Sequence, residues 1–283
     1  MGTDRRIVPN IMKRHILIFL LLFCFSAYAA AEDPGQKFQG FNLEGFADDG
    51  SKSWDVNGDT ADIEGQEIKL TNVDANTYGE RTMNVKAKTG FVNQTSGKMR
   101  LEKDVVITSD EGQQLITDSL DWDRNADLVT TEDDVKIVDE RFSAYGSGMR
   151  AQPGQKLAQL NRDVTMYVDT VPESEDDNLV TITCDGPVVI DQAEGKATFE
   201  DNVVAVQTDR TLKADVMEVY FNEDMSSISS MICIGNVVIM QGGNKTYAEK
   251  AVYNAQTKKM TLSGRPKLII QTEGEGAITS FGN

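Results

Sequence analysis

The chain has 283 residues, of which 40% are hydrophobic, and its formal net charge at pH 7 is −17. This length allows one large β-core or two smaller ones, and so acidic a chain is repelled by nucleic acid. Its single histidine, His15, lies in the N-terminal segment, which excludes His-based triads and ordinary His-ligated metal sites from the rest of the chain. We therefore expect no cofactor, no bound metal and no nucleic-acid partner.

Residues 1–31 have the features of a secretory signal peptide. Two basic residues, Lys13 and Arg14, precede an apolar run from Ile16 to Phe25, and small residues follow as far as Ala31. We expect export and cleavage after Ala29 or Ala31. The apolar stretch is just shorter than the ~17 residues that a membrane-spanning helix needs, and an uncleaved inner-membrane anchor is the alternative.

A first sheet segment is predicted from Phe41 to about Tyr78. Turn signals occur at residues 48–50 (Asp-Asp-Gly) and at 57–58, where Asn-Gly between β-compatible flanks favours a two-residue hairpin. The string 55–59 begins like a calcium loop, but Thr60 stands where that loop needs Gly, so we expect a plain turn.

From about residue 82 a two-strand unit recurs, and each copy closes on a short strand that begins with Asp or Asn followed by Val. These closing strands begin at Asp104, Asp134, Asp163, Asn202 and Asn236, at intervals of 29 to 39 residues, with a degenerate sixth at Arg265-Pro266. Such periods indicate stacked small units that bury their apolar faces only against their neighbours. Period-2 alternation with polar turns predicts an all-β fold, an elongated antiparallel body with no helix after residue 31.

An acidic stretch at residues 172–178 interrupts the alternation and is predicted to be a solvated linker. It separates a β-domain at 41–171 from a second at 179–283. Because both carry the same unit, they could stack into one body or behave as two domains, and the sequence leaves this open.

Residues two apart on a closing strand point to the same face. The resulting apolar ladder consists of Val105, Ile107, Val135, Ile137, Val164, Met166, Val237, Ile239, Leu268 and Ile270. One interpretation is a sealed core, which is what half-buried strands usually form. The other is an open sheet whose trough holds an apolar ligand. Cys184 and Cys233 lie in apolar strands, as buried free thiols or as one disulfide.

Two C-terminal units share a pattern of Ala-Asp/Glu, then Tyr, then Gly-Asn-Val-x-Ile or a shortened form of it. It occurs at residues 212–239 and 247–264 and resembles the OstA-like (LptA-like) periplasmic proteins of lipopolysaccharide export. The N-terminal half, from Phe41 through Tyr167, is similar to the LptC-like family, the inner-membrane-side component of the same bridge.

The resemblance implies a β-taco or β-jellyroll fold whose interior carries the acyl chains of lipid A in the periplasm, without catalysis. The implied partners are lipopolysaccharide, other bridge proteins joined head to tail through edge strands, and an inner-membrane ABC transporter complex. Whether the chain replaces one bridge component or fuses two stays open. The alternatives are a structural or adhesive β-repeat protein and, with less support, a carboxylate-based carbohydrate-active enzyme.

Overall fold

The computed structural model describes residues 35–47, 49–78, 82–140, 142–169, 179–222 and 227–271. The described residues from Gln36 onward belong to one compact unit. The predicted signal segment and the predicted linker at 172–178 lie outside the described residues.

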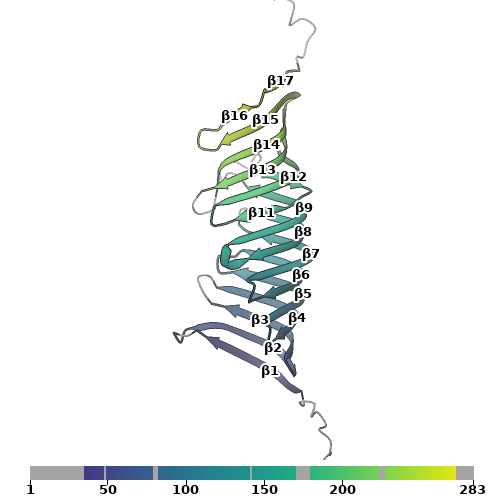
Figure 1. The fold of residues 1–283 in the computed structure, drawn as a ribbon, viewed down its shortest axis with the longest axis vertical. Helices are drawn as coiled ribbons and strands as arrows, with labels where there is room; N and C mark the ends of the chain where they lie inside the picture. Colours follow the sequence, from purple (N-terminus) through teal and green to yellow (C-terminus); the bar gives the residue numbers. More distant parts are fainter. Residues whose placement is uncertain are drawn as a thin grey trace, which may run out of the picture. The chain divides into compact units, whose positions relative to one another are not determined.

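In the described residues, seventeen strands form one antiparallel sheet, and each strand pairs with the next one in the chain except β10 with β11 and β16 with β17 (Figure 1). Their bounds are β1 Gln36–Phe46, β2 Lys52–Glu64, β3 Glu67–Thr77, β4 Met83–Asn93, β5 Lys98–Ser109, β6 Gln114–Asp123, β7 Leu128–Val138, β8 Phe142–Gln152, β9 Leu157–Asp169, β10 Leu179–Cys184, β11 Val188–Asp191, β12 Lys196–Gln207, β13 Arg210–Phe221, β14 Ile228–Gln241, β15 Asn244–Asn254, β16 Lys259–Ser263 and β17 Lys267–Ile269. The described ranges contain no α-helix and one short 3-10 helix, η1 (Pro153–Gln155). The predicted all-β antiparallel fold is confirmed.

Most long strands bend near their middle. The pairing register shifts between Glu102 and Val105 in β5, and between Glu200 and Val203 in β12. A residue at or next to the bend adopts a left-handed backbone, with φ of 53° at Asp163, 54° at Asn202 and 46° at Asn236. Asp and Asn are the side-chain-bearing residues that tolerate this conformation best.

The bends correct one sequence prediction. Five of the predicted closing strands are the second halves of longer strands and not separate strands; they begin at Asp104 in β5, Asp134 in β7, Asp163 in β9, Asn202 in β12 and Asn236 in β14. Only the sixth, at Arg265-Pro266, leads into a separate short strand, β17. The recurring Asp or Asn therefore marks a corner in a long strand. At two places the chain is broken at the corner, so that two short strands occupy the position of one long strand. β10 and β11 both lie between β9 and β12. Likewise, β16 and β17 both pair with β15.

The corners divide the sheet into two walls. We call the halves such as 98–102 of β5 and 196–200 of β12 the first wall, and the halves such as 105–109 and 203–207 the second wall. Phe199 in the first wall and Val164 in the second are each 1% exposed and belong to one hydrophobic cluster that extends from β4 to β15. A single sheet exposes both faces, so this burial requires the two walls to pack against each other.

A smaller cluster of Phe41, Ala61, Leu70 and Val73 fills the region of β1 to β3. The predicted turn near residue 50 is confirmed, because the Gly50 N–H donates to the Ala47 carbonyl at 2.9 Å. The hairpin predicted at 57–58 is wrong, because both residues lie inside β2. A Cβ on Gly58 would lie 2.6 Å from the Phe41 ring, so the glycine allows a close approach within the sheet instead of a turn.

Candidate functional site

The inner face of the second wall carries an unbroken row of cross-strand partners from β4 to β17, which we call the inner ladder. It consists of Val85, Ile107, Leu115, Ile137, Ala144, Met166, Ile182, Ala205, Leu212, Ile239, Thr246 and Leu268. No member is charged. Directly opposite pairs in a sheet have their Cβ atoms about 4.5–5.5 Å apart, so the ladder is a continuous stripe, apolar except at Thr246, that crosses every strand row from β4 onward.

Burial varies along the inner ladder. Its middle is sealed, with Ala144 and Ile182 exposed by 0% and 1%. On either side the ladder is only half-buried, at Ile107, Leu115 and Ile137 toward β5 and at Leu212 and Ile239 toward β14. Leu268, at the C-terminal edge, is 59% exposed.

The first wall explains why the middle is sealed. Its inner face carries Met149, Leu160, Val188, Phe199 and Met217 as successive cross-strand partners, each at most 3% exposed. These large side chains fill the space between the walls where the inner ladder is fully buried.

The predicted site residues fall into three groups. Val105, Val135, Val164, Met166 and Val237 are buried in the core, and the four valines follow a corner directly. Ile107, Ile137 and Ile239 are the half-buried members of the inner ladder. Leu268 and Ile270 are exposed at the C-terminal edge. Sequence analysis missed Leu115, Ile182 and Leu212, because it considered only strands that carry the Asp/Asn-Val motif. Period-2 alternation in the intervening strands was the available signal.

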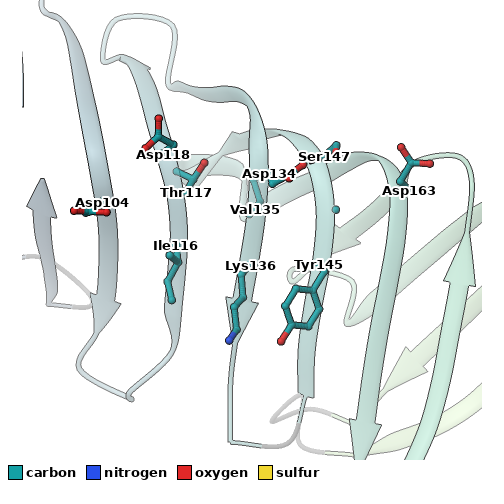
Figure 2. A pocket seen from close by; sticks show the side chains of 11 residues that line it. Asp104, Ile116, Thr117, Asp118, Asp134, Val135, Lys136, Tyr145, Ser147 and Asp163 are labelled. Carbon is teal, nitrogen blue, oxygen red and sulfur yellow. Dashed lines mark hydrogen bonds between the residues drawn. The ribbon is translucent and has the colours of Figure 1, made fainter.

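The outer face bears an open depression of about 530 Å³ where β5 to β9 bend (Figure 2). Ile116, Lys136 and Tyr145 are cross-strand partners that face outward, and Lys136 Nζ lies 5.5 Å from the centroid of the Tyr145 ring. In Figure 2 the carboxylates lie along the bend, and the Ser147 hydroxyl donates to Asp134 Oδ1 at 2.6 Å. The lining is mixed, with carboxylates and Lys136 beside apolar surface of Ile116, Val135 and Tyr145. Ile116, Lys136 and Tyr145 each lie one residue from a member of the inner ladder, so they point to the opposite face of the sheet.

A charged network stabilises the N-terminal edge in addition to the small apolar cluster of β1 to β3. Asn76 Nδ2 donates to Asp55 Oδ1 at 2.9 Å, and the Tyr78 hydroxyl donates to Oδ2 at 2.7 Å. Lys52 Nζ lies 2.9 Å from the same Oδ2 and 2.8 Å from Glu44 Oε1. Hydrogen bonds, with the one from Asn76 foremost, lower the pKa of Asp55 to about 2. Asp55, which sequence analysis placed in a turn, is thus a buried residue within β2.

The two cysteines in the sheet are free and buried. Burial raises the pKa of the Cys184 thiol to about 11 and that of Cys233 to about 12. Within the described ranges no group of three or more His, Cys, Asp or Glu side chains is arranged to hold a metal ion. The same ranges hold no helix long and apolar enough to cross a membrane.

A single sheet, folded along its corners around an uncharged ladder, defines the β-taco class of proteins. Residues 24–169, just over half of the chain, match the family model of LptC-related lipopolysaccharide-assembly proteins, so the chain belongs to this family. Residues 181–280 match the model of the LptA and LptD N-terminal-domain lipopolysaccharide transport proteins. Both matches support lipopolysaccharide transport, and neither supports the structural, adhesive or enzymatic alternatives.

Among solved structures, the chain is similar to LptH of Pseudomonas aeruginosa, the LptA-homologous periplasmic component of its lipopolysaccharide transport device. The identity is 12%, and the match covers 67% of this chain and 95% of LptH. Its TM-score is 0.22, so family membership depends on the sequence matches alone. No curated protein matches the chain.

The order of the two matched regions identifies the chain as a lipopolysaccharide-transport bridge protein, with its LptC-related part first. The sheet is continuous between the two regions. β9, which ends the first, pairs with β10 along Cys184↔Val164 to Leu179↔Asp169 and with β11 along Leu157–Leu160.

Proposed function

We propose that the space between the two walls shields the acyl chains of lipopolysaccharide while the glycolipid crosses the periplasm. The observation that carries this proposal is the inner ladder, an uncharged row of partners that runs from β4 to the C-terminal edge. Burying hydrocarbon is worth about 0.8 kcal/mol per methylene, so a chain of about twelve carbons gains on the order of 10 kcal/mol. An apolar path removes that barrier to transfer.

The proposed activity needs no catalytic residue. The acyl chain exchanges one apolar environment for another, so the direction of movement has to come from an energy-coupled partner, which we propose is an inner-membrane ABC transporter complex. The sugars and phosphates stay in solvent, because the chain as a whole is acidic and repels an anionic headgroup.

The proposed path begins at the half-buried flanks. Ile107, Ile137 and Ile239 contact the core yet retain exposed surface, so an acyl chain can replace water there first. In the sealed middle the walls have to separate, because Phe199 and Met217 fill the space that the ligand requires.

The two ends of the sheet are the proposed joints to other bridge proteins. Among the described strands, β1 pairs only with β2, while β16 and β17 pair only with β15. Both ends expose large apolar side chains, Phe38 and Phe46 in β1 and Leu268 and Ile269 in β17. An unpaired edge with exposed apolar side chains favours strand addition by another chain.

Export is also part of the proposal. We propose that residues 1–31 direct the chain to the periplasm and are cleaved there, with an uncleaved anchor as the alternative. Mass spectrometry of the protein from the periplasmic fraction distinguishes the two, because cleavage after Ala29 or Ala31 gives a defined loss of mass.

Native mass spectrometry of delipidated protein, with and without purified lipopolysaccharide, tests the proposed function. The expected result is a complex whose mass exceeds that of the protein by the mass of one glycolipid. Added lipid A should displace the glycolipid and reduce the amount of this complex. A spectrum that shows only the unliganded protein at saturating lipopolysaccharide would contradict the proposal. It would favour a structural protein whose two walls enclose no ligand.

A further inference from the structure

One buried polar atom in the described part of the chain lacks a hydrogen-bond partner, and it is the indole Nε1 of Trp122. Buried Trp N–H groups usually find an acceptor, and each exception requires an explanation. A phenylalanine would fill much of the same space without leaving a buried donor unpaired. The unpaired N–H therefore points to a role beyond packing.

The fold places Trp122 on the inner face of the first wall, one residue before β6 ends at Asp123. Leu120, nearer the corner on the same face, is buried, whereas Trp122 is half-buried and packs against the core. Its cross-strand partners are Met99 in β5 and Val129 in β7. The donor thus lies far from the corners, beside the outer rim of the first wall.

The neighbours of Trp122 form a second apolar row, the rim ladder. It consists of Met99, Trp122, Val129, Ala151, Ala158, Ile190, Ala197, Val219, Met231, Tyr253 and Met260. Because turns follow at this rim, it separates the apolar interior from solvent. Trp suits such a border, with an apolar ring on one side and one polar donor.

We propose that the Trp122 N–H donates a hydrogen bond to an acyl carbonyl oxygen, ester or amide, of the glycolipid between the walls. This inference rests on the proposed function and specifies its ligand chemistry. With the alkyl tails between the walls and the sugars in solvent, the carbonyls that join them lie at the rim, at the depth of Trp122. A neutral carbonyl fits better than a phosphate, whose charge favours solvent over an apolar environment.

Trp122 is therefore a positioning residue. It sets the depth at which the head of an acyl chain stops, and it favours ester- or amide-linked chains over ether-linked chains of the same length. The apolar ladders themselves cannot distinguish these ligands, because the hydrophobic effect is non-directional.

The test uses the whole mature protein with ¹⁵N-labelled tryptophan and two synthetic probes. One is an acylated glucosamine phosphate with ester and amide linkages, and the other is its ether-linked counterpart with equal chain length. The protein has two tryptophans, and Trp54 in β2 packs in the N-terminal region, away from the rim ladder. Its indole resonance is the internal reference.

The expected result is a downfield shift of the Trp122 indole proton with the acyl probe, a smaller shift with the ether probe, and no change at Trp54. Trp122→Phe should raise the Kd of the acyl probe about fivefold, the effect of one neutral hydrogen bond, and leave the Kd of the ether probe unchanged. The spectra of the unmodified protein keep the test decisive if the variant folds poorly.

Two outcomes would overturn the proposal in different ways. If both probes bind and shift the Trp122 proton equally, the donor does not contact a carbonyl, and the proposed transport function is unaffected. If neither probe binds at any concentration tested, the inference fails together with the proposed function.

Discussion

The middle and the flanks of the inner ladder use the same alternating pattern but differ in what faces them. In the middle, Met166 and Ile182 are buried beneath Leu160, Phe199 and Met217. In the flanks, Ile107, Ile137 and Ile239 stay half-buried. The comparison teaches that alternation alone makes an apolar wall, and that packing from the first wall, which alternation does not specify, decides whether the wall becomes core or remains accessible.

The sealed middle also coincides with the junction of the two matched families. β9 ends the LptC-related match and β10 begins just before the LptA-related match. Val164 and Cys184, which pair across this junction, are 1% and 4% exposed. The junction is thus part of a continuous packed sheet, and any ligand that passes along the whole interior has to open it.

Phe199→Ala should have the largest effect on stability. It removes the largest fully buried side chain from the middle, and such cavities cost about 3–5 kcal/mol. Urea unfolding followed by circular dichroism measures the loss. Ile239→Ala in the flank is the matched variant, and an equal loss there would contradict the contrast between middle and flank.

Thiol chemistry tests how tightly the middle is closed. Because burial raises the pKa of Cys184 from 9.0 to about 11, its thiolate fraction at pH 8 should be about a hundredfold below that of an exposed cysteine. Iodoacetamide should therefore react slowly with the native protein and fast in urea. Fast native alkylation of Cys184 would show that the walls already separate without ligand.

Substitutions in the flanks of the inner ladder should change the Kd for lipopolysaccharide more than they change the free energy of unfolding. Ile137→Thr replaces apolar surface at a half-buried position, and we expect about a tenfold higher Kd for lipopolysaccharide, because roughly two methylene equivalents are lost. Val238→Thr on the outer face of β14 is the control. Equal weakening by both variants would indicate binding that does not depend on the inner face.

The stability of the N-terminal edge, β1 to β3, should depend on pH below about 4, whereas that of the sealed middle should not. Asp55 has a folded-state pKa of about 2 and an ordinary value of 3.8, so its contribution to stability is present above about pH 4 and is lost as pH falls toward 2. The ¹⁵N-indole resonance of Trp54, which is distinct from that of Trp122, should report loosening of β1 to β3 in this window. Asp55→Asn should remove the pH dependence, and an unchanged acid transition in that variant would contradict the assignment.

Much of the fold could be predicted because the sequence repeats. The positions of the Asp/Asn-Val motif coincide with corners of long strands, but the sequence analysis interpreted the motif as the start of a separate strand. The corner at Asn202 is a left-handed residue inside β12. It becomes evident only from the register shift between β12 and β13. The hairpin predicted at Asn57-Gly58 is wrong for a similar reason, because the role of the glycine depends on a contact that the local sequence does not show. Its glycine accommodates the Phe41 ring, a contact between residues that are distant in sequence.

The candidate site was less predictable. Alternation placed Val135 and Ile137 on one face, yet their different burial depends on how far each lies from the corner and on which side chains face it. Trp122 gave no signal in the sequence, because an unpaired indole N–H is a property of the packed structure.

Paired photo-crosslinking tests the central claim most directly. A photoreactive amino acid would be placed singly at the inward Ile137 and Ile239 and at their outward neighbours Lys136 and Val238, and each protein irradiated with lipopolysaccharide. The account predicts glycolipid adducts at Ile137 and Ile239 and none above background at Lys136 and Val238. Adducts at the outward positions alone, or equal adducts at all four, would contradict transport between the walls.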